Sequence, residues 1–313
     1  MRLLVTGGCG FIGSNFISHW LSGHPGSEIV NLDLMTYAAD MRNLEEAEGR
    51  GCETVVGDIA DRDLVSRIVR DVDAVVNFAA ETHVDSSIMD SAQFVHSNVI
   101  GVHSILEACR KHEKRLHHVS TDEVYGSLGP GEGRFTESSG YAPMNPYSAT
   151  KAAGDHLVRA YFNTYGIKAT ISNCGNNYGP RQHAEKLVPK TITNAMLGRK
   201  IPVYGSGRQI RDWIHVWDHC SAIEAILEKG RLGETYLVGA SNEMENINVI
   251  KSILRTMGKQ DSLIEHVADR PGHDARYALD PSKLVKETGW ICRYGFEEGM
   301  KATVDWYLKR IGS

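Results

Sequence analysis

The stretch VTGGCGFIGSNF, residues 5–16, joins a short apolar run to a segment with a helical pattern. Three glycines, Gly7, Gly10 and Gly13, stand three residues apart within it. Glycine in such a turn permits a tight bend, lets the backbone approach a pyrophosphate and lets the following helix pack closely. The N-terminus of that helix also favours the phosphate charge. The stretch therefore predicts a dinucleotide-binding turn between the first strand and the first helix of an α/β fold.

An acidic residue strengthens this interpretation. Asp33 ends the next apolar run, EIVNLD, 20 residues after Gly13, where a carboxylate can bind adenosine ribose hydroxyls. The following residues, DLMTYAA, contain no arginine or lysine for a 2′-phosphate, so NAD is favoured over NADP. Asp58 and Ile59 in GDIAD are candidates for the adenine edge. The alternative, glycines that only shape a turn, is disfavoured by Asp33 and the strand–helix context.

The same alternation of apolar runs and helical segments continues to about residue 175. Strands are predicted over residues 2–6, 28–33, 53–57, 73–80, 115–121 and 168–173, and helices over 11–23, 41–48, 61–69, 91–112 and 147–165. This order predicts a doubly wound parallel Rossmann sheet covered on both faces, with ligands at the carboxyl ends of its strands. We expect residues 1–175 to form the NAD-binding domain. Residues 176–313 are expected to form mostly a smaller, interleaved lobe, with residues 234–239 rejoining the main sheet.

Bulk properties exclude several classes of protein. The net charge of −5 and pI near 6.3 provide no basic stripe for a nucleic acid or an anionic membrane. No apolar run approaches the length of a membrane span. Six scattered cysteines without a CxxC pair suit free thiols in a reducing compartment, and the first strand begins too early for a signal peptide. A cytoplasmic protein is predicted.

A second motif, YSATK, places Tyr147 and Lys151 four residues apart at the start of a predicted helix. That spacing puts both side chains on one helix face. The ammonium can there lower the pKa of the phenol, so that a phenolate removes a proton from a substrate alcohol as hydride leaves the same carbon. YxxxK alone is more often an exposed helical turn. Downstream of a dinucleotide motif, the catalytic interpretation is favoured.

The third motif, STDEVYG, places Thr121, Asp122 and Glu123 at the end of a predicted buried strand. Neighbouring side chains of a regular strand point to opposite faces, so we expect the strand to end or bend by Asp122. Two carboxyl groups in one site are expected to have separated pKa values, as an acid and a base working together require. The alternative is an acidic turn that faces water.

Together these motifs resemble the extended short-chain dehydrogenase/reductase superfamily, and TDEVYG, EKLVP, RDWIHVWDHC and RPGHD resemble its dTDP-glucose 4,6-dehydratases. The resemblance covers nearly the whole chain. It implies a lyase that converts a nucleoside-diphosphate hexose to its 4-keto-6-deoxy form with NAD. It also implies a homodimer in which the helices over residues 91–112 and from Tyr147 pair into a four-helix bundle, and a nucleotide-sugar site in the second lobe.

The resemblance also implies roles for individual residues. Glu123 takes the C5 proton, Asp122 protonates the departing C6 hydroxyl, and Thr121 binds the C4 oxygen. Tyr147 is the base for oxidation, and Lys151 binds the nicotinamide ribose. Implied cofactor contacts, besides Tyr147 and Lys151, are Gly7, Gly10, Phe11, Ile12, Gly13, Asp33, Thr36, Asp58, Ile59, Ala79, Ala80 and Asn98. Implied substrate contacts are Asn176, Lys186, Leu187, Pro202, Tyr204, Arg211, Asn246, Arg270 and His273.

Some positions depart from the family pattern. The usual RCSNNYGP reads NCGNNYGP, with Asn173 and Gly175 changed, the usual YQFPEKL reads RQHAEKL, and Leu34 replaces a lysine after Asp33. These departures bear on which sugar or base is used rather than on the reaction type.

Other functions of the same fold predict a different motif composition. A nucleotide-sugar 4-epimerase or decarboxylase of the same fold would lack one or both carboxyl groups of the TDE motif. A non-catalytic NAD-binding sensor would have lost Tyr147, Lys151 or those carboxyls, and all are present. The segment HVWDHC places His215 and His219 four residues apart, but a metal site needs further convergent ligands, so no metal is predicted.

Overall fold

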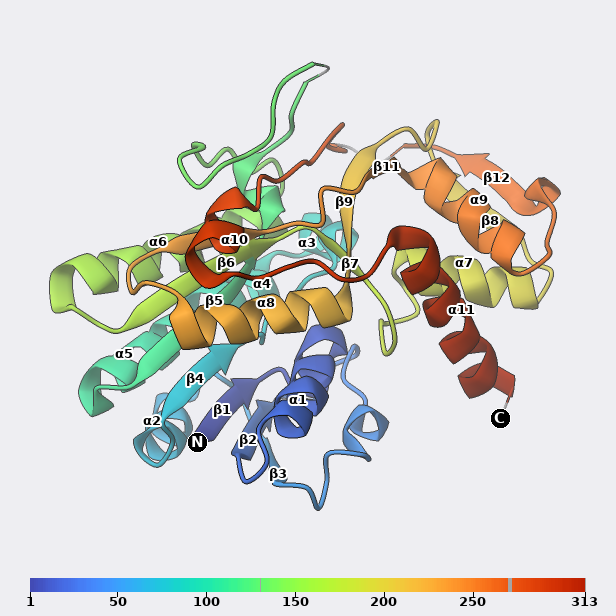
Figure 1. Ribbon diagram of the computed structural model, residues 1–313. Helices are drawn as coiled ribbons and strands as arrows, with labels where there is room; N and C mark the ends of the chain where they lie inside the picture. The colour runs from blue at the N-terminus through green and yellow to red at the C-terminus, as the bar shows by residue number, and fades with distance from the viewer. Residues whose placement is uncertain (130, 270–271, 313) are drawn as a thin grey trace.

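The computed structural model describes residues 1–129, 131–269 and 272–312, and its centre is a seven-stranded sheet in the order β10-β6-β5-β4-β1-β2-β3. All neighbouring strands in it are parallel. The strands are β1 (Arg2–Thr6), β2 (Glu28–Asp33), β3 (Cys52–Val56), β4 (Ala74–Asn77), β5 (Arg115–Thr121), β6 (Ala169–Cys174) and β10 (Thr235–Val238). The predicted doubly wound sheet is confirmed, and β10 lies at its edge beside β6 (Figure 1).

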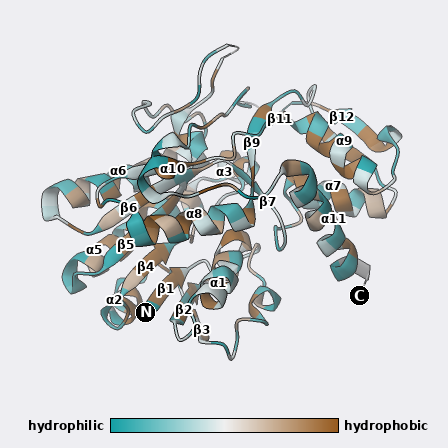
Figure 2. Cartoon of the chain, viewed as in Figure 1, coloured by the Kyte–Doolittle hydropathy of each residue, from teal (hydrophilic) through white to brown (hydrophobic). Residues whose placement is uncertain are grey.

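Helices cover both faces of this sheet (Figure 1). Helices α1 (Phe11–Gly23) and α8 (Val216–Lys229) pack on one face, and α2 (Arg62–Arg70), α5 (Val102–His112) and α6 (Pro146–Tyr165) pack on the other. The alternation of strand side chains divides the core between the faces: Leu3 and Val5 belong to the cluster with α1, whereas Leu4 belongs to the cluster with α5. The apolar residues accordingly concentrate in the strands and the inner sides of the helices (Figure 2).

Two predicted helices differ from the observed elements. The predicted helix over 91–112 is divided into α4 (Ala92–Val95), a π-helical turn η2 (His96–Gly101) and α5. The wider turn places Asn98 in the interior, where its side-chain amide binds the backbone of Glu81 through both its oxygen (3.0 Å) and its nitrogen (3.1 Å). The segment over 41–48 forms only a short 3₁₀ turn, η1 (Met41–Leu44).

A second group of elements packs beside the carboxyl ends of the strands (Figure 1). A three-stranded sheet has the order β11-β9-β7, and β12 pairs with β8. The strands of these two small sheets are β7 (Asn176–Tyr178), β8 (Ile201–Tyr204), β9 (Ile210–His215), β11 (Glu243–Glu245) and β12 (Ile264–Val267). Helices α7 (Leu187–Met196), α9 (Asn246–Thr256) and α11 (Phe296–Gly312) enclose a separate core around Tyr178, Trp213 and Met300. Short elements complete the described chain, namely α3 (Val84–Met89), η3 (Asp122–Tyr125), η4 (Asp261–Leu263) and α10 (Ser282–Thr288).

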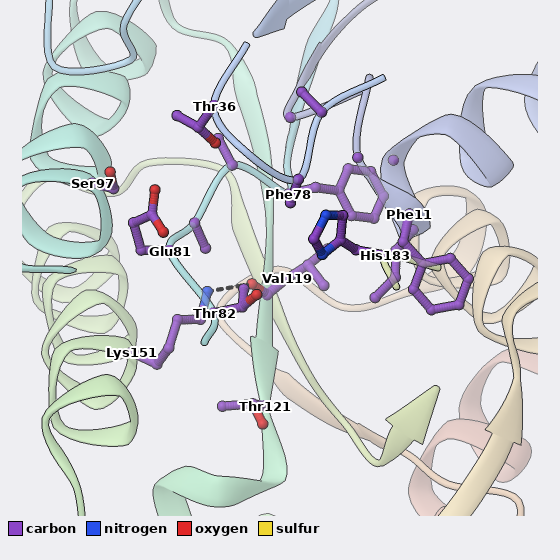
Figure 3. A pocket seen from close by; sticks show the side chains of 18 of the residues that line it. Phe11, Thr36, Phe78, Glu81, Thr82, Ser97, Val119, Thr121, Lys151 and His183 are labelled. Carbon is purple, nitrogen blue, oxygen red and sulfur yellow. Dashed lines mark hydrogen bonds between the residues drawn. The ribbon is translucent and has the colours of Figure 1, made fainter. Parts of the chain in front are cut away.

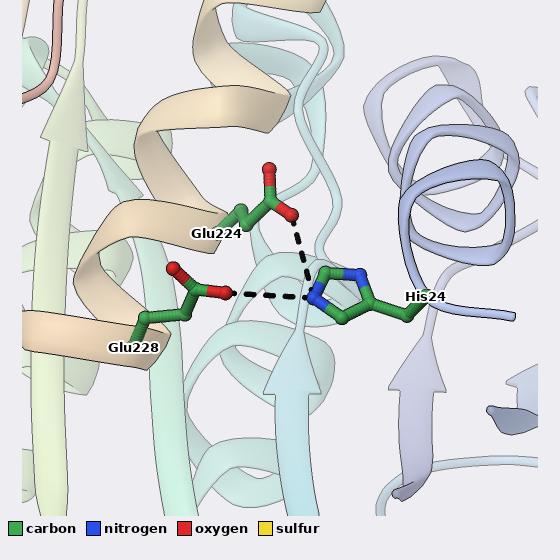
Figure 4. A group of neighbouring side chains, drawn as sticks. All are labelled: His24, Glu224 and Glu228. Carbon is green, nitrogen blue, oxygen red and sulfur yellow. Dashed lines mark ion pairs between the residues drawn. The ribbon is translucent and has the colours of Figure 1, made fainter.

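Helices α1 and α8 are also joined by ion pairs near the end of α1 (Figure 4). His24 Nε2 lies 3.5 Å from both Glu224 Oε1 and Glu228 Oε1, and His19 Nε2 lies 2.7 Å from Glu224 Oε2. These partly exposed pairs supplement the apolar contact between the two helices.

Among the helices of the described residues, none is both long enough and apolar enough to cross a membrane.

Candidate active site

A cavity of about 320 Å³ opens at the carboxyl ends of β1, β2, β4, β5 and β6. It brings together most residues predicted for the cofactor and all those predicted for catalysis (Figure 3). The predicted residues that line it are Gly7, Gly10, Phe11, Ile12, Gly13, Asp33, Thr36, Asp58, Ile59, Ala79, Ala80, Thr121, Asp122, Glu123, Tyr147, Lys151, Asn176 and Lys186.

The glycine turn is packed so closely that side chains would not fit. Gly7 has φ +70°, and a Cβ atom there would lie 2.8 Å from the backbone nitrogen of Ala79. A Cβ atom at Gly13 would lie 2.4 Å from the carbonyl oxygen of Gly7. The turn is therefore a backbone-lined cradle at the N-terminus of α1, which suits a pyrophosphate.

Asp33 is fixed at the end of β2 by two backbone donors. Its carboxylate accepts hydrogen bonds from the backbone nitrogens of Cys9 and Met35, both at 2.9 Å. The side chain of Leu34 lines the same part of the cavity and is 46% exposed. Where the family pattern has a lysine, this chain thus presents an apolar side chain beside the acid.

The TDE motif occupies the turn that follows the central strand β5. The strand ends at Thr121 and the chain turns into η3 at Asp122, as the motif predicts. Thr121 Oγ1 accepts a hydrogen bond from the Glu123 backbone nitrogen at 3.3 Å, which caps the turn. The turn brings two adjacent carboxyl groups to one cavity, which a continuing strand would have pointed apart.

The two carboxyl groups have different surroundings. Asp122 is only 2% exposed, and burial, followed by the charge of Glu123, raises the pKa of its carboxyl well above the ordinary value. Its Oδ2 has no hydrogen-bond partner among the described residues. Glu123 is only half-buried, and its Oε2 lies 3.5 Å from the side-chain nitrogen of Asn145. Asp122 is thereby suited to hold a proton.

Tyr147 and Lys151 enter the cavity from the first turns of α6. Asn145 caps this helix with a capping box, and Pro146 is its first residue, an arrangement that favours a helix start. The side chain of Lys151 donates a 2.8 Å hydrogen bond to the carbonyl of Val119 on β5 (Figure 3). The side chain of Lys151 is therefore held against the central strand.

The pKa of Tyr147 differs from the sequence-based expectation. Burial, followed by the charge of Glu123, raises the pKa of the phenol well above 10.0, whereas a lowering by Lys151 was expected. The reason is that the side chain is surrounded by protein and by acidic neighbours, both of which disfavour a phenolate. The ammonium of Lys151 is itself buried, and burial lowers its pKa.

Several lining residues were missed by sequence reasoning. Glu81, Ser97, His183 and Glu185 line the cavity. Burial, followed by the charge of Glu185, raises the pKa of Glu81, and the ring of His183 meets that of Tyr37 edge-on at 5.5 Å. The position of Glu185 directly before Lys186 in EKL was the one available signal.

Other predicted contacts do not line this cavity, namely Asn98, Leu187, Pro202, Tyr204, Arg211, Asn246 and His273, and Arg270 lies outside the described residues. The guanidinium of Arg211 donates to the carbonyl oxygens of Ile210 and Asp274 and lies over the ring of Tyr277 at 4.2 Å.

The rings of Tyr204 and His273 meet at 6.3 Å, and the Tyr204 hydroxyl donates to Asp85 at 3.3 Å. Asn246 begins α9, and its backbone nitrogen donates to the carbonyl of Gln209. Tyr204 and His273 therefore form a second group beside α3.

The substitution at Gly175 has a local steric reason. A Cβ atom there would lie 2.7 Å from the carbonyl oxygen of Asp212, so glycine permits the close approach of β9 to the turn between β6 and β7. The histidines of HVWDHC have structural contacts: His219 Nδ1 lies 3.0 Å from Asn177 Oδ1, and His215 caps α8.

Comparison with known proteins agrees with this geometry. The family model described as GDP-mannose 4,6 dehydratase matches residues 4–303. A dTDP-glucose 4,6-dehydratase of Mycobacterium tuberculosis (strain H37Rv) is 52% identical over 309 residues, covering 98% of this chain and 93% of the relative. One of Mycolicibacterium smegmatis is 53% identical with the same coverage.

Solved structures give the same result. The dTDP-glucose 4,6-dehydratase DesIV from Streptomyces venezuelae, with NAD and TYD bound, superposes with a TM-score of 0.97 at 44% identity, covering 100% of this chain and 98% of that one. A UDP-glucose 4-epimerase from Thermus thermophilus in complex with NAD has a TM-score of 0.90 at 31% identity, with 98% and 99% coverage. From the matched motifs, the site and these relatives, the chain belongs to the dTDP-glucose 4,6-dehydratase family of the extended short-chain dehydrogenase/reductase superfamily.

Proposed function

We propose that this protein catalyses the NAD-dependent dehydration of dTDP-glucose to its 4-keto-6-deoxy product. The observation that carries the proposal is the cavity itself, which joins the glycine turn to Thr121, Asp122, Glu123, Tyr147 and Lys151. The glycine cradle and the fixed carboxylate of Asp33 fit the pyrophosphate and adenosine ribose of NAD. DesIV, which this chain resembles, was solved with NAD and TYD.

Each residue has one task in the reaction. Bound NAD supplies a positively charged ring that can take up and return a hydride. Tyr147 receives the proton of the C4 hydroxyl as that carbon loses its hydride, and Thr121 donates a hydrogen bond to the resulting ketone oxygen. Lys151 provides positive charge that favours the phenolate, which burial alone disfavours.

The elimination step uses the two carboxyl groups in opposite protonation states. The C4 ketone acidifies the C5 proton, which Glu123 takes. The C6 hydroxyl leaves with the proton of Asp122 as water, and the C5–C6 double bond forms. Return of the hydride to C6 would then leave Glu123 to give a proton back to C5, so that the only net change is the loss of one water.

The substrate contacts remain part of this proposal. Asn176 and Lys186 line the cavity, and the side chain of Lys186 donates to the carbonyl of Thr82 at 3.1 Å. We assign the diphosphate to this region and the base to the group around Tyr204 and His273. The division into a cofactor part over residues 1–175 and a mostly substrate-binding part over residues 176–313 follows from this assignment.

The direct test is to incubate the untagged protein with dTDP-glucose and, separately, with UDP-glucose, without added reductant. We expect the loss of one water by mass, an alkaline absorbance from the 4-keto product, no net NADH, and a higher rate with the thymidine nucleotide. A product of unchanged mass but inverted C4 would identify a 4-epimerase. The carboxyl groups of Asp122 and Glu123 argue against that outcome. Loss of carbon dioxide from a uronic acid analogue would instead identify a decarboxylase.

We also infer a homodimer that pairs α4–η2–α5 and α6 with the same helices of a second chain. Large apolar side chains are exposed on these helices and on α3, namely Ile88, Met89, Val95, Ile100 and Tyr165, with Met89 86% exposed. A patch of this kind is typical of an isologous interface. Light scattering should give twice the chain mass, and Ile100→Asp should shift the protein toward the monomer.

A cytoplasmic location is part of the same proposal. All six cysteines are free, which suits a reducing compartment. Fractionation of the producing cells should recover the enzyme with cytoplasmic markers, and recovery with an exported fraction would contradict the proposal.

A further inference from the structure

A row of buried polar side chains crosses the sheet and ends beneath the catalytic helix α6. Thr6 Oγ1 on β1 donates to Asn77 Oδ1 on β4 at 2.6 Å, and Asn77 Nδ2 lies 3.0 Å from His118 Nδ1 on β5. His118 Nε2 then faces Asp155 Oδ1 on α6 at 3.5 Å. None of the four is more than 1% exposed. Burying such groups is costly unless they are paired. The buried carboxyl of Asp155, where the row ends, therefore needs a partner.

The contacts fix the orientation of the row. Because Asn77 Oδ1 accepts from Thr6, its Nδ2 donates to His118 Nδ1, which assigns the His118 proton to Nε2. Burial lowers the pKa of His118 well below 6.5, so the ring is neutral, and its Nε2 faces Asp155 Oδ1 at 3.5 Å without forming a hydrogen bond. The row thus presents a fixed dipole, rather than a charge, to the carboxyl of Asp155.

Asp155 is held from its other side as well. Its Oδ2 accepts hydrogen bonds from the Tyr141 hydroxyl at 2.7 Å and from Asn173 Nδ2 at 2.9 Å. The guanidinium of Arg159 donates to the same Tyr141 hydroxyl at 2.7 Å. Both groups that bond to Asp155 are hydrogen-bond donors. Donors favour a carboxylate over a carboxylic acid.

The group with a full charge that acts most strongly on this carboxyl is Lys151, one helical turn earlier on α6. Burial lowers the pKa of Lys151, while Asp155 and, less strongly, Cys174 raise it. Burial raises the pKa of Asp155, while Lys151, Tyr141, Asn173 and Ser120 lower it. The remaining neighbours are neutral or more remote: His118 is uncharged, the Tyr125 hydroxyl donates to Asn173, and the guanidinium of Arg159 donates to the hydroxyls of Tyr141 and Thr235 rather than to Asp155. Lys151 and Asp155 therefore form a buried pair in which each favours the charged form of the other.

We propose that Asp155 is a positioning residue for catalysis, whose carboxylate keeps the Lys151 ammonium charged inside the buried site. Residues four apart on a helix have Cβ atoms roughly 6 Å apart. At a charge separation of about 6 Å and an effective dielectric of about 20, a unit charge shifts a pKa by about 2 pH units. The inference rests on the catalytic role proposed above for Lys151.

The test is the pH dependence of kcat/KM for Asp155→Asn, which keeps the shape of the side chain and removes its charge. Lys151 loses its positive charge as the pH rises through its pKa. Because Asp155→Asn lowers that pKa, the alkaline limb of the profile should move to lower pH by about 2 units. Asp155→Glu should return the limb toward the wild-type position. Tyr141→Phe is the matched control: it removes one hydrogen bond from the carboxylate and leaves the charge, so the melting temperature falls while the limb stays.

Two outcomes would overturn the inference: an unmoved limb in Asp155→Asn, or equal movement in Asp155→Asn and Tyr141→Phe. If Asp155→Asn does not fold, NMR titration of the ¹³Cε-labelled lysines of the wild type decides, because a neutral Lys151 at pH 8 would contradict the pairing. The variant Lys151→Met distinguishes the proposed role of Lys151 from the proposed role of Asp155. Full activity in that variant refutes the proposed role of Lys151. If Lys151→Met is inactive but the alkaline limb of Asp155→Asn does not move, only the role of Asp155 is refuted.

Discussion

Replacing Asp122 with asparagine should abolish most activity and at the same time stabilise the protein at neutral pH. The substitution keeps the size of a side chain that is 2% exposed and removes the proton that the departing C6 hydroxyl needs. General acid catalysis contributes typically 10²–10⁴-fold, so kcat should fall by that factor, equivalent to about 3–5 kcal/mol of activation free energy. The Asp122→Asn protein should still oxidise C4, and reduced cofactor should accumulate.

The stability change follows from the raised pKa of the same carboxyl. Between the ordinary pKa and the raised pKa, the folded state keeps a proton that the unfolded state has lost. The free energy of unfolding therefore falls as the pH rises through this window, with a slope of up to about 1.4 kcal/mol per pH unit. An asparagine does not titrate, so the Asp122→Asn variant should lack this slope.

Urea unfolding between pH 5 and pH 8 measures the difference, and Asp63→Asn on the exposed first turn of α2 is the matched control. The variant and the wild type should diverge steadily as the pH rises, with the variant the more stable. Parallel stability curves, or activity within tenfold of the wild type, would refute the assignment of Asp122 as the buried acid.

Three further changes test other parts of the site. Tyr147→Phe should lower kcat by about 10²–10⁴-fold with NAD still bound, because it removes the base for oxidation; a rapid-mixing trace at 340 nm should show no transient NADH, and a normal transient would exclude Tyr147. Gly13→Ala should cost about 1–3 kcal/mol and reduce bound NAD, because its Cβ would lie 2.4 Å from the Gly7 carbonyl oxygen; unchanged NAD content and unfolding would contradict the cradle. His24→Ala should lower stability by less than about 1 kcal/mol, because its partners are partly exposed; a much larger loss in thermal melts would show that the pairs matter more than their exposure implies.

The sequence predicted the features that depend on local chemistry. The spacing of Gly7, Gly10 and Gly13 determines the turn, and the alternation of apolar runs and helical segments determines the parallel sheet. The end of β5 at Thr121 followed from the same kind of argument, since two adjacent carboxyl groups cannot serve one cavity from a regular strand. Each of these conclusions needs only residues that are close in the sequence.

Features that depend on distant contacts could not be predicted. The π-helical turn at residues 96–101 depends on the contact between the side-chain amide of Asn98 and the backbone of Glu81, which lies 17 residues earlier in the chain. The guanidinium of Arg211 meets carbonyl oxygens that only the folded chain brings near. The raised pKa of Tyr147 depends on burial, and the motif YSATK alone does not show how deeply the side chain is buried.

The position of β10 has a consequence for synthesis of the chain. Its strand lies at the sheet edge beside β6, yet residue 235 is translated 61 residues after residue 174, the end of β6. At a translation rate of about 5–20 residues per second, the hydrogen-bonding edge of β6 stays unpaired for roughly 3–12 s. An unpaired edge of this kind is a template for association with other chains. The ribosome-bound intermediate thus exposes this edge to association with other chains until Thr235–Val238 is translated and pairs with β6.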